Sequence, residues 1–320
     1  MQRSYILGLP VLVLLALSPL VMPAWLISLS TIALGNGLVV LGLIVMWRAG
    51  LVSFGQALYF AMGAYSVALM LRLTPVTDAI VLVFIAMVLG GVTAFVIGFL
   101  LARYREIFFA MLSLALSMIL YGLLVKSAAL GSTDGFGVAD FTLLGQTLDG
   151  AAREIAIFWL ALGFAALGTV AIWAYRGSVA GASAIPLREN EIRVEYLGAS
   201  ANRLVHLKVV IAGILASAGG AIVAMAVGHV DPDMSYWTTS GGFVFVAIMA
   251  GASSVIAAFA GSIVFELIRT AALAFFPQGW QLILGGVLLA TIMFFPNGIG
   301  ALVTSQKSPR PVGASRRAAS

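Results

Sequence analysis

The sequence predicts an all-α, polytopic membrane helix bundle with about ten transmembrane segments and both termini in the cytoplasm. Hydrophobic residues make up 62% of the chain and charged residues only 9%, proportions that exclude a water-soluble globule. Apolar stretches of roughly 20 residues, long enough to cross a hydrocarbon core of about 30 Å as helix, recur along the chain. Residues 80–101 are apolar on every face, which excludes the alternating pattern of barrel strands.

The predicted spans follow one another through short connections. In order they cover residues 5–22, 25–46, 50–71, 79–102, 107–127, 156–175, 207–229, 239–257, 259–275 and 280–296. No cleavage site of small residues follows the first span, so we expect it to be retained. With a cytoplasmic N-terminus, all but four of the 17 Lys and Arg residues fall on the cytoplasmic side, which satisfies the positive-inside rule. Those four are Arg72, Lys126, Arg153 and Arg269.

Two of the spans carry small residues at every fourth position. Such spacing lets helix backbones approach closely, so these residues are interpreted as packing positions rather than as a substrate lining. They are Ala86, Gly90, Ala94, Gly98 and Ala102 in one span, and Ala212, Ala216, Gly220, Ala224 and Gly228 in the other.

Polar residues within the spans mark candidate positions along a translocation pathway. The span that starts at Gly50 contains several glycines, which permit breaks in a helix, and its polar and aromatic side chains are pathway candidates. Hydrogen bonding to neighbouring helices explains the same polar residues equally well. The candidates in this span are Ser53, Gln56, Tyr59, Phe60 and Tyr65.

Glu266 and Arg269 are the clearest ionisable residues inside a predicted span. Their spacing of three places them on one helical face, where they can pair. A structural ion pair and a role in gating or in the pathway both remain open. Arg269 could instead extend to the outer interface.

Residues 176–208 form a charged island in an apolar chain. Pro186 stands where a short amphipathic surface helix could begin, and an isolated loop of this kind favours docking of a partner over a merely solvated surface. The predicted domains are therefore a transmembrane domain over residues 1–303, which includes this loop, and a basic cytoplasmic tail over residues 304–320. That tail is too polar to bury a core.

Several blocks in order resemble the LivM-type permease subunits of ABC importers for branched-chain and other hydrophobic amino acids. The resemblance covers about residues 30–302. The blocks are Gly50-Leu-Val-Ser-Phe-Gly-Gln with Gly63-Ala-Tyr, Phe108-Phe-Ala-Met-Leu-Ser-Leu-Ala, Gly131-Ser-Thr-Asp-Gly, Arg188-Glu-Asn-Glu, Trp280-Gln-Leu-Ile-Leu-Gly and Phe295-Pro-Asn-Gly.

The resemblance implies a coupling helix that inserts into a cleft of an ATPase subunit. The residues that form or flank it are Arg188, Glu189, Asn190, Glu191, Glu195 and Gly198. ABC importers generally place a glycine four residues after Glu-Ala-Ala, whereas here Glu195-Tyr-Leu leads directly to Gly198.

The resemblance also implies partners and a location. A homologous second permease subunit, two ABC ATPases and a periplasmic substrate-binding protein would assemble with this chain in the bacterial inner membrane, in contact with lipid and without nucleic acid. Amino acids are the expected substrates, with urea, amides and aromatic acids as alternatives. The rival function is an ATP-independent channel or a secondary carrier, although a proton-coupled carrier would bury more titratable groups than this chain offers.

Catalysis on this chain is not expected. It has no Gly-x-x-x-x-Gly-Lys-Ser/Thr motif, so nucleotide phosphates would bind to partner subunits. It has no cysteine and only His206 and His229 as imidazoles, so the sequence predicts neither a cofactor nor a metal. It also lacks His-Glu-x-x-His, and Ser240-Gly241 does not complete an intramembrane-protease motif.

Overall fold

The computed structural model describes residues 19, 22–251, 254–294 and 298. The first predicted span lies outside these residues apart from positions 19 and 22, and the basic tail lies outside them entirely. The predictions for those two segments therefore stay predictions.

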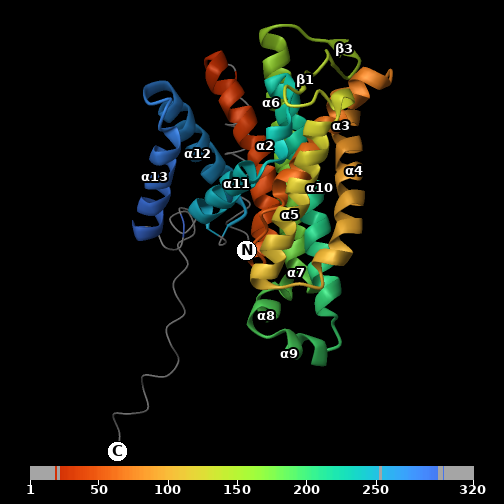
Figure 1. Cartoon of the computed structure of the whole chain (residues 1–320), viewed down its shortest axis with the longest axis vertical. Helices are drawn as coiled ribbons and strands as arrows, with labels where there is room; N and C mark the ends of the chain where they lie inside the picture. The colour runs from red at the N-terminus through yellow and green to blue at the C-terminus, as the bar shows by residue number, and fades with distance from the viewer. Residues whose placement is uncertain (1–18, 20–21, 252–253, 295–297, 299–320) are drawn as a thin grey trace, which may run out of the picture.

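The described chain is a bundle of long helices that run between two ends (Figure 1). The long helices are α2 (Ala24–Trp47), α3 (Gln56–Leu73), α4 (Ala79–Leu101), α5 (Glu106–Lys126), α6 (Ala151–Gly177), α10 (Ala201–Val227) and α12 (Ile256–Phe275). Two shorter apolar helices, α11 (Trp237–Ala250) and α13 (Trp280–Phe294), lie beside α12. The predicted all-α membrane bundle is confirmed.

The predicted number of spans is not confirmed. Each predicted span from residue 25 onward coincides with a helix, but six helices in the described residues are long and apolar enough to cross a membrane. Helix α11 has 14 residues and so spans about 21 Å, less than a hydrocarbon core of about 30 Å. It ends at Gly251, whose φ of 76° is unfavourable for other residues.

Helix α10 lies at the centre of the bundle and packs on α2, α3 and α4. Its small residues allow this, because a Cβ at Gly220 would overlap the Phe60 carbonyl oxygen of α3. The stripe of α4 packs in the same way: Gly90 lies against Ser217 of α10, while Val88 on another face of α4 is exposed. The packing interpretation of the stripes is thus confirmed for these residues. Gly228 instead ends α10, with a φ of 74°.

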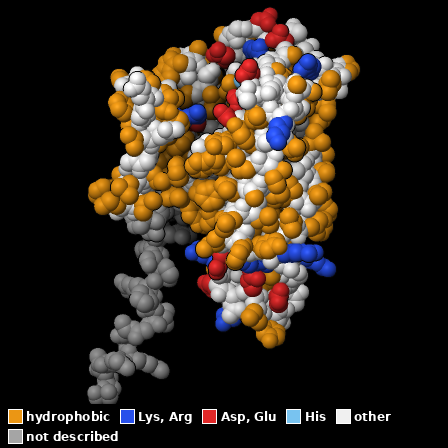
Figure 2. Space-filling model, in the orientation of Figure 1, with side chains coloured by type: hydrophobic (Ala, Val, Ile, Leu, Met, Phe, Trp, Pro, Cys, Tyr) orange, Lys and Arg blue, Asp and Glu red, His pale blue; other side chains and the backbone are white. Residues whose placement is uncertain are grey.

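The two ends of the bundle differ in structure. One end carries η2 (Ala128–Leu130), η3 (Pro232–Ser235) and two small antiparallel sheets, β1–β4 and β2–β3. Their strands are β1 (Phe136–Gly137), β2 (Thr142–Leu143), β3 (Gln146–Thr147) and β4 (His229–Val230). The other end carries α7 (Val179–Ala182), α8 (Ala184–Glu189) and α9 (Glu191–Tyr196). Figure 2 shows Lys and Arg side chains gathered where the apolar wall of the bundle meets this second end.

Three local predictions need correction. The charged loop forms three short helices rather than one amphipathic helix, because Asn190 is extended and its side chain caps α9 by accepting from the Arg193 amide at 3.0 Å. Helix α10 begins at Ala201 rather than at residue 207, and Lys208 is buried in it, donating to the Ala180 carbonyl at 3.3 Å. Helix α3 begins only at Gln56, after a non-helical stretch.

Candidate functional site: the coupling segment and the pathway residues

The segment predicted to couple to an ATPase, called the coupling segment here and consisting of α7–α9, combines a buried underside with an exposed outer face. Leu187 and Val194 are buried and hold the segment against the bundle. Of the residues expected to form the coupling helix, Glu191 is half-buried and the others are exposed, namely Arg188, Glu189, Asn190, Glu195 and Gly198.

Helix α9 and the residue after it also expose apolar side chains. Ile192 is 64% exposed, Tyr196 88% and Leu197 81%. Figure 2 shows hydrophobic side chains beyond the band of Lys and Arg at this end of the bundle. An apolar group on a charged surface that lies outside the apolar wall is typical of a protein-docking site. Gly198, with a φ of 86°, ends α9 directly after this group.

Arg105, in the connection between α4 and α5, fastens α9 to the bundle. Its Nε pairs with the Glu191 carboxylate, and another guanidinium nitrogen donates to Asn202 Oδ1 at 2.9 Å. It also donates to the Ala102 and Tyr104 carbonyls at 2.6 and 2.9 Å. One side chain thus joins α9 and the first turn of α10 to the α4–α5 connection.

The segment also contacts the entry to α3. Gly50 has a φ of 78°, and a Cβ placed there would lie 3.1 Å from Cγ of Arg188 in α8. The Gly50–Gln56 block and the Arg188–Glu191 block, noted separately in the sequence, are therefore neighbours in the fold.

The non-helical entry to α3 is held by serine hydroxyls from other helices. The Phe54 amide donates to Ser113 Oγ of α5 at 3.1 Å, and the Ala57 amide donates to Ser240 Oγ of α11 at 3.0 Å. Ser53 Oγ accepts from the Gly55 amide at 3.2 Å. Ser53 therefore has a local hydrogen bond, two residues along the chain, and not the predicted bond to a neighbouring helix.

Gln56 differs from its neighbours because it is fully buried and neither of its amide atoms has a partner among the described residues. Such a group costs about 1–3 kcal/mol when left unpaired. Tyr65 is similar, because its buried hydroxyl also lacks a partner in the described part of the chain. Buried polar groups without a partner are better candidates for contact with a solute or water than polar groups that already have hydrogen bonds within the fold.

The predicted pathway residues do not form one continuous surface. Tyr59 and Phe60 are buried, and the Phe60 ring lies 5.2 Å from that of Phe243 in α11. Tyr65 is nine residues after Gln56, which places it on the opposite face of α3, and its ring lies 5.8 Å from Phe136 at the sheet end.

Glu266 and Arg269 do pair, with 3.6 Å between nitrogen and oxygen, as predicted from their spacing. Glu266 is buried and also accepts from Asn36 Nδ2 of α2 at 2.8 Å, while Arg269 is more exposed and lies over the Trp280 ring. This pair joins α12 to α2, and among the described residues it makes no hydrogen bond or ion pair with the candidates at α3. Asn36 was missed in the sequence, although an amide between two glycines inside an apolar span was a visible signal.

Arg105, Ser113 and Ser240 were also missed as members of these sites. A single Arg in a short connection and single Ser residues in helices carry no local signal, because each acts on a residue far away in the sequence. Their roles follow from packing alone.

Comparison with known proteins supplies the family. No curated protein and no solved structure matches the chain. Residues 25–293 match the family described as "Branched-chain amino acid transport system / permease component", and the matched range includes the coupling segment and all of α2–α13 except Ala24 and Phe294. The match confirms the family resemblance drawn from the ordered blocks. The chain, a multi-pass membrane protein, therefore belongs to the family of branched-chain amino acid transport permease components.

Proposed function

We propose that this chain is the transmembrane permease subunit of an ATP-driven importer in the bacterial inner membrane. A periplasmic binding protein delivers the solute, a homologous second permease subunit completes the pathway, and two ATPase subunits drive transport. The preferred substrates are branched-chain or other hydrophobic amino acids. Family membership supports the class of transport system. The use of ATP, the partner subunits, the substrate and the bacterial inner membrane are proposed.

The observation that carries the proposal is the coupling segment. Helix α9 exposes an apolar group that includes Tyr196, and the helix is fastened to the bundle through Arg105 and Glu191. A rigidly held apolar tip suits insertion into a cleft of an ATPase. Movement of that tip can pass to α3 through the contact between Arg188 and Gly50.

Within α3 we propose that the buried, unpaired amide of Gln56 is the best candidate for contact with the solute or with water in the pathway. The other candidates rank lower. Ser53 is hydrogen-bonded, Tyr59 and Phe60 are buried by packing, and Tyr65 lies on the opposite face of α3. Glu266 and Arg269 are assigned to joining α12 with α2.

The outer loops are candidates for contact with the binding protein. Residues 131–135 and 231–237 lie at the sheet end of the bundle, where β1 pairs with β4 next to them. Their turns are also explained by local hydrogen bonding, such as the Asp231 side chain that caps η3.

Co-purification tests the proposal. The chain is co-expressed with candidate permease and ATPase partners, and ATP-driven uptake is measured in liposomes with and without the binding protein. Glu195→Arg reverses an exposed charge on α9 and is expected to abolish stimulated ATPase activity, while the two permease subunits still assemble. Asp149→Arg makes the same charge change at an exposed position of the opposite end and is expected to retain the ATPase subunits.

The rival function gives a different result. A chain that purifies without ATPase subunits and passes solute without ATP is a channel or a secondary carrier. Unchanged ATPase stimulation in Glu195→Arg would refute the role assigned to α9.

A further inference from the structure

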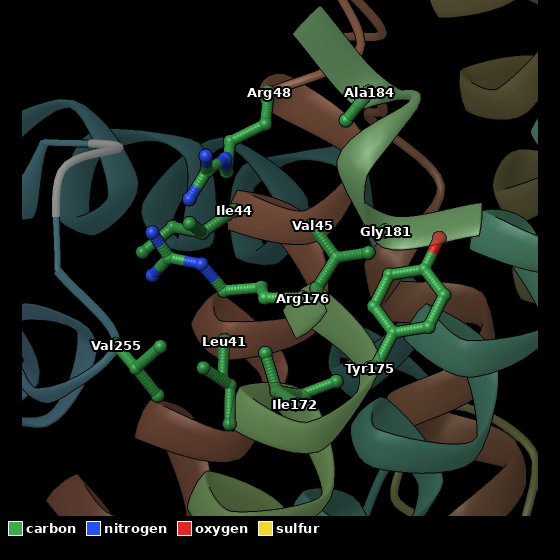
Figure 3. Close-up of a pocket in the computed structure, with 10 residues that line it drawn as sticks. All are labelled: Leu41, Ile44, Val45, Arg48, Ile172, Tyr175, Arg176, Gly181, Ala184 and Val255. Carbon is green, nitrogen blue, oxygen red and sulfur yellow. The ribbon is translucent and has the colours of Figure 1, made fainter. Parts of the chain in front are cut away.

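Two arginines line one pocket beside the coupling segment. Arg48 follows the last residue of α2, and Arg176 lies in the last turn of α6. Both side chains line one pocket between α2, α6 and the α7–α8 connection, and Figure 3 shows their guanidinium groups on the same side of it. Both residues are half-buried.

The two positive charges have no counterion among the residues that the structure describes. The two guanidinium charges lie close enough to repel each other. Burial lowers the pKa of Arg48 from its ordinary value. All 12 Asp and Glu residues fall in the described residues, and the carboxylates found in ion pairs there contact Arg105, Arg153 and Arg269. Nor does either guanidinium donate a hydrogen bond to a described residue.

Apart from Tyr175, whose hydroxyl donates to the Ala180 carbonyl at 3.3 Å, the rest of the pocket lining is apolar. Leu41, Ile44 and Ile172 are buried in its wall, and Val255 completes the apolar lining. The two arginines lie at the C-terminal ends of α2 and α6, at the end of the bundle that carries α7 and α8. A pair of guanidinium groups above an apolar wall at a membrane surface suits a group with a phosphate and an attached hydrocarbon portion.

We propose that Arg48 and Arg176 form a binding site for a phosphate group, supplied by the headgroup of an anionic phospholipid. Arg is the residue best suited to bidentate contact with phosphate oxygens, and basic pockets between transmembrane helices bind such headgroups. The phosphate relieves the repulsion between the two cations. Because Gly181 and Ala184 of the coupling segment line the same pocket, the bound headgroup also braces that segment against α2 and α6.

The test uses the full-length chain in a neutral detergent. Binding is measured by thermal shift on titration with phosphatidylglycerol, with phosphatidylcholine and with inorganic phosphate. Arg48→Gln/Arg176→Gln is compared with Arg103→Gln/Arg203→Gln, which removes two exposed charges from the same end of the bundle. We expect the pocket variant to bind phosphatidylglycerol at least about tenfold more weakly than the wild type and the control variant.

Each outcome decides one point. Saturation by inorganic phosphate at the affinity of the lipid would assign the same site to free phosphate instead of a headgroup. Equal phosphatidylglycerol affinity in the pocket and control variants would overturn the site. If the double variant does not purify in a folded state, Arg176→Gln alone is expected to weaken binding several-fold, and an unchanged affinity there refutes the proposal.

Discussion

Removal of the Arg105 side chain tests how the coupling segment is held. Arg105→Met keeps an apolar stem of similar shape and deletes the ion pair with Glu191 and the 2.9 Å hydrogen bond to Asn202. The Arg105 and Glu191 side chains are 25% and 37% exposed, so solvent screening reduces the contribution of the pair. The ion pair is the contact that holds α9, and being partly exposed it contributes roughly 0.5–1 kcal/mol, whereas the bond to Asn202 holds the first turn of α10.

A loss of that size raises the opening equilibrium of α9 by about 2–5-fold. Hydrogen–deuterium exchange of the purified chain measures it at the amides of Val194 and Leu197, which bond to the Asn190 and Arg193 carbonyls. Exchange in the central turns of α10 should not change, because those turns are fixed by packing against α2, α3 and α4.

The matched control is Arg103→Met, which removes an exposed charge two residues away. Its α9 amides should exchange as in the wild type. The exchanged pair, Arg105→Glu with Glu191→Arg, should recover part of the protection. If α9 exchange in Arg105→Met equals that of the control, the fastening role assigned to Arg105 is wrong.

The remaining predictions concern the bundle interior. Gly220→Ala places a Cβ against the Phe60 carbonyl oxygen and should destabilise the fold by about 1–3 kcal/mol. Gly122→Ala, with no atom within 4 Å of the new Cβ, should be neutral or stabilise by up to about 1 kcal/mol, and thermal unfolding in detergent compares the two. Gln56→Met should raise stability by about 1–3 kcal/mol while reducing solute uptake, because it removes an unpaired buried amide. A lower unfolding temperature for this variant would show that the amide has a partner, such as bound water.

The sequence alone determined the features that depend on local composition. Apolar runs located α2, α4 and α5 within one or two residues, because a helix in lipid must bond its own backbone over the whole apolar length. The spacing of three between Glu266 and Arg269 predicted their pairing, since both belong to one helix. Ordered sequence blocks indicated the family, which the match over residues 25–293 confirmed.

Tertiary structure alone decided which faces meet. A helix that is apolar all round shows no periodicity that would distinguish its packed face from its lipid face, so only the small-residue stripes carried such a signal. The contacts of Arg105 with Glu191 and of Asn36 with Glu266 join residues 86 and 230 positions apart. Two further pairs also join residues that are distant in the sequence: Arg48 and Arg176 line one pocket, and Gly50 lies against Arg188. Local sequence fixes the helices, but contacts between distant residues exist only after the helices have packed.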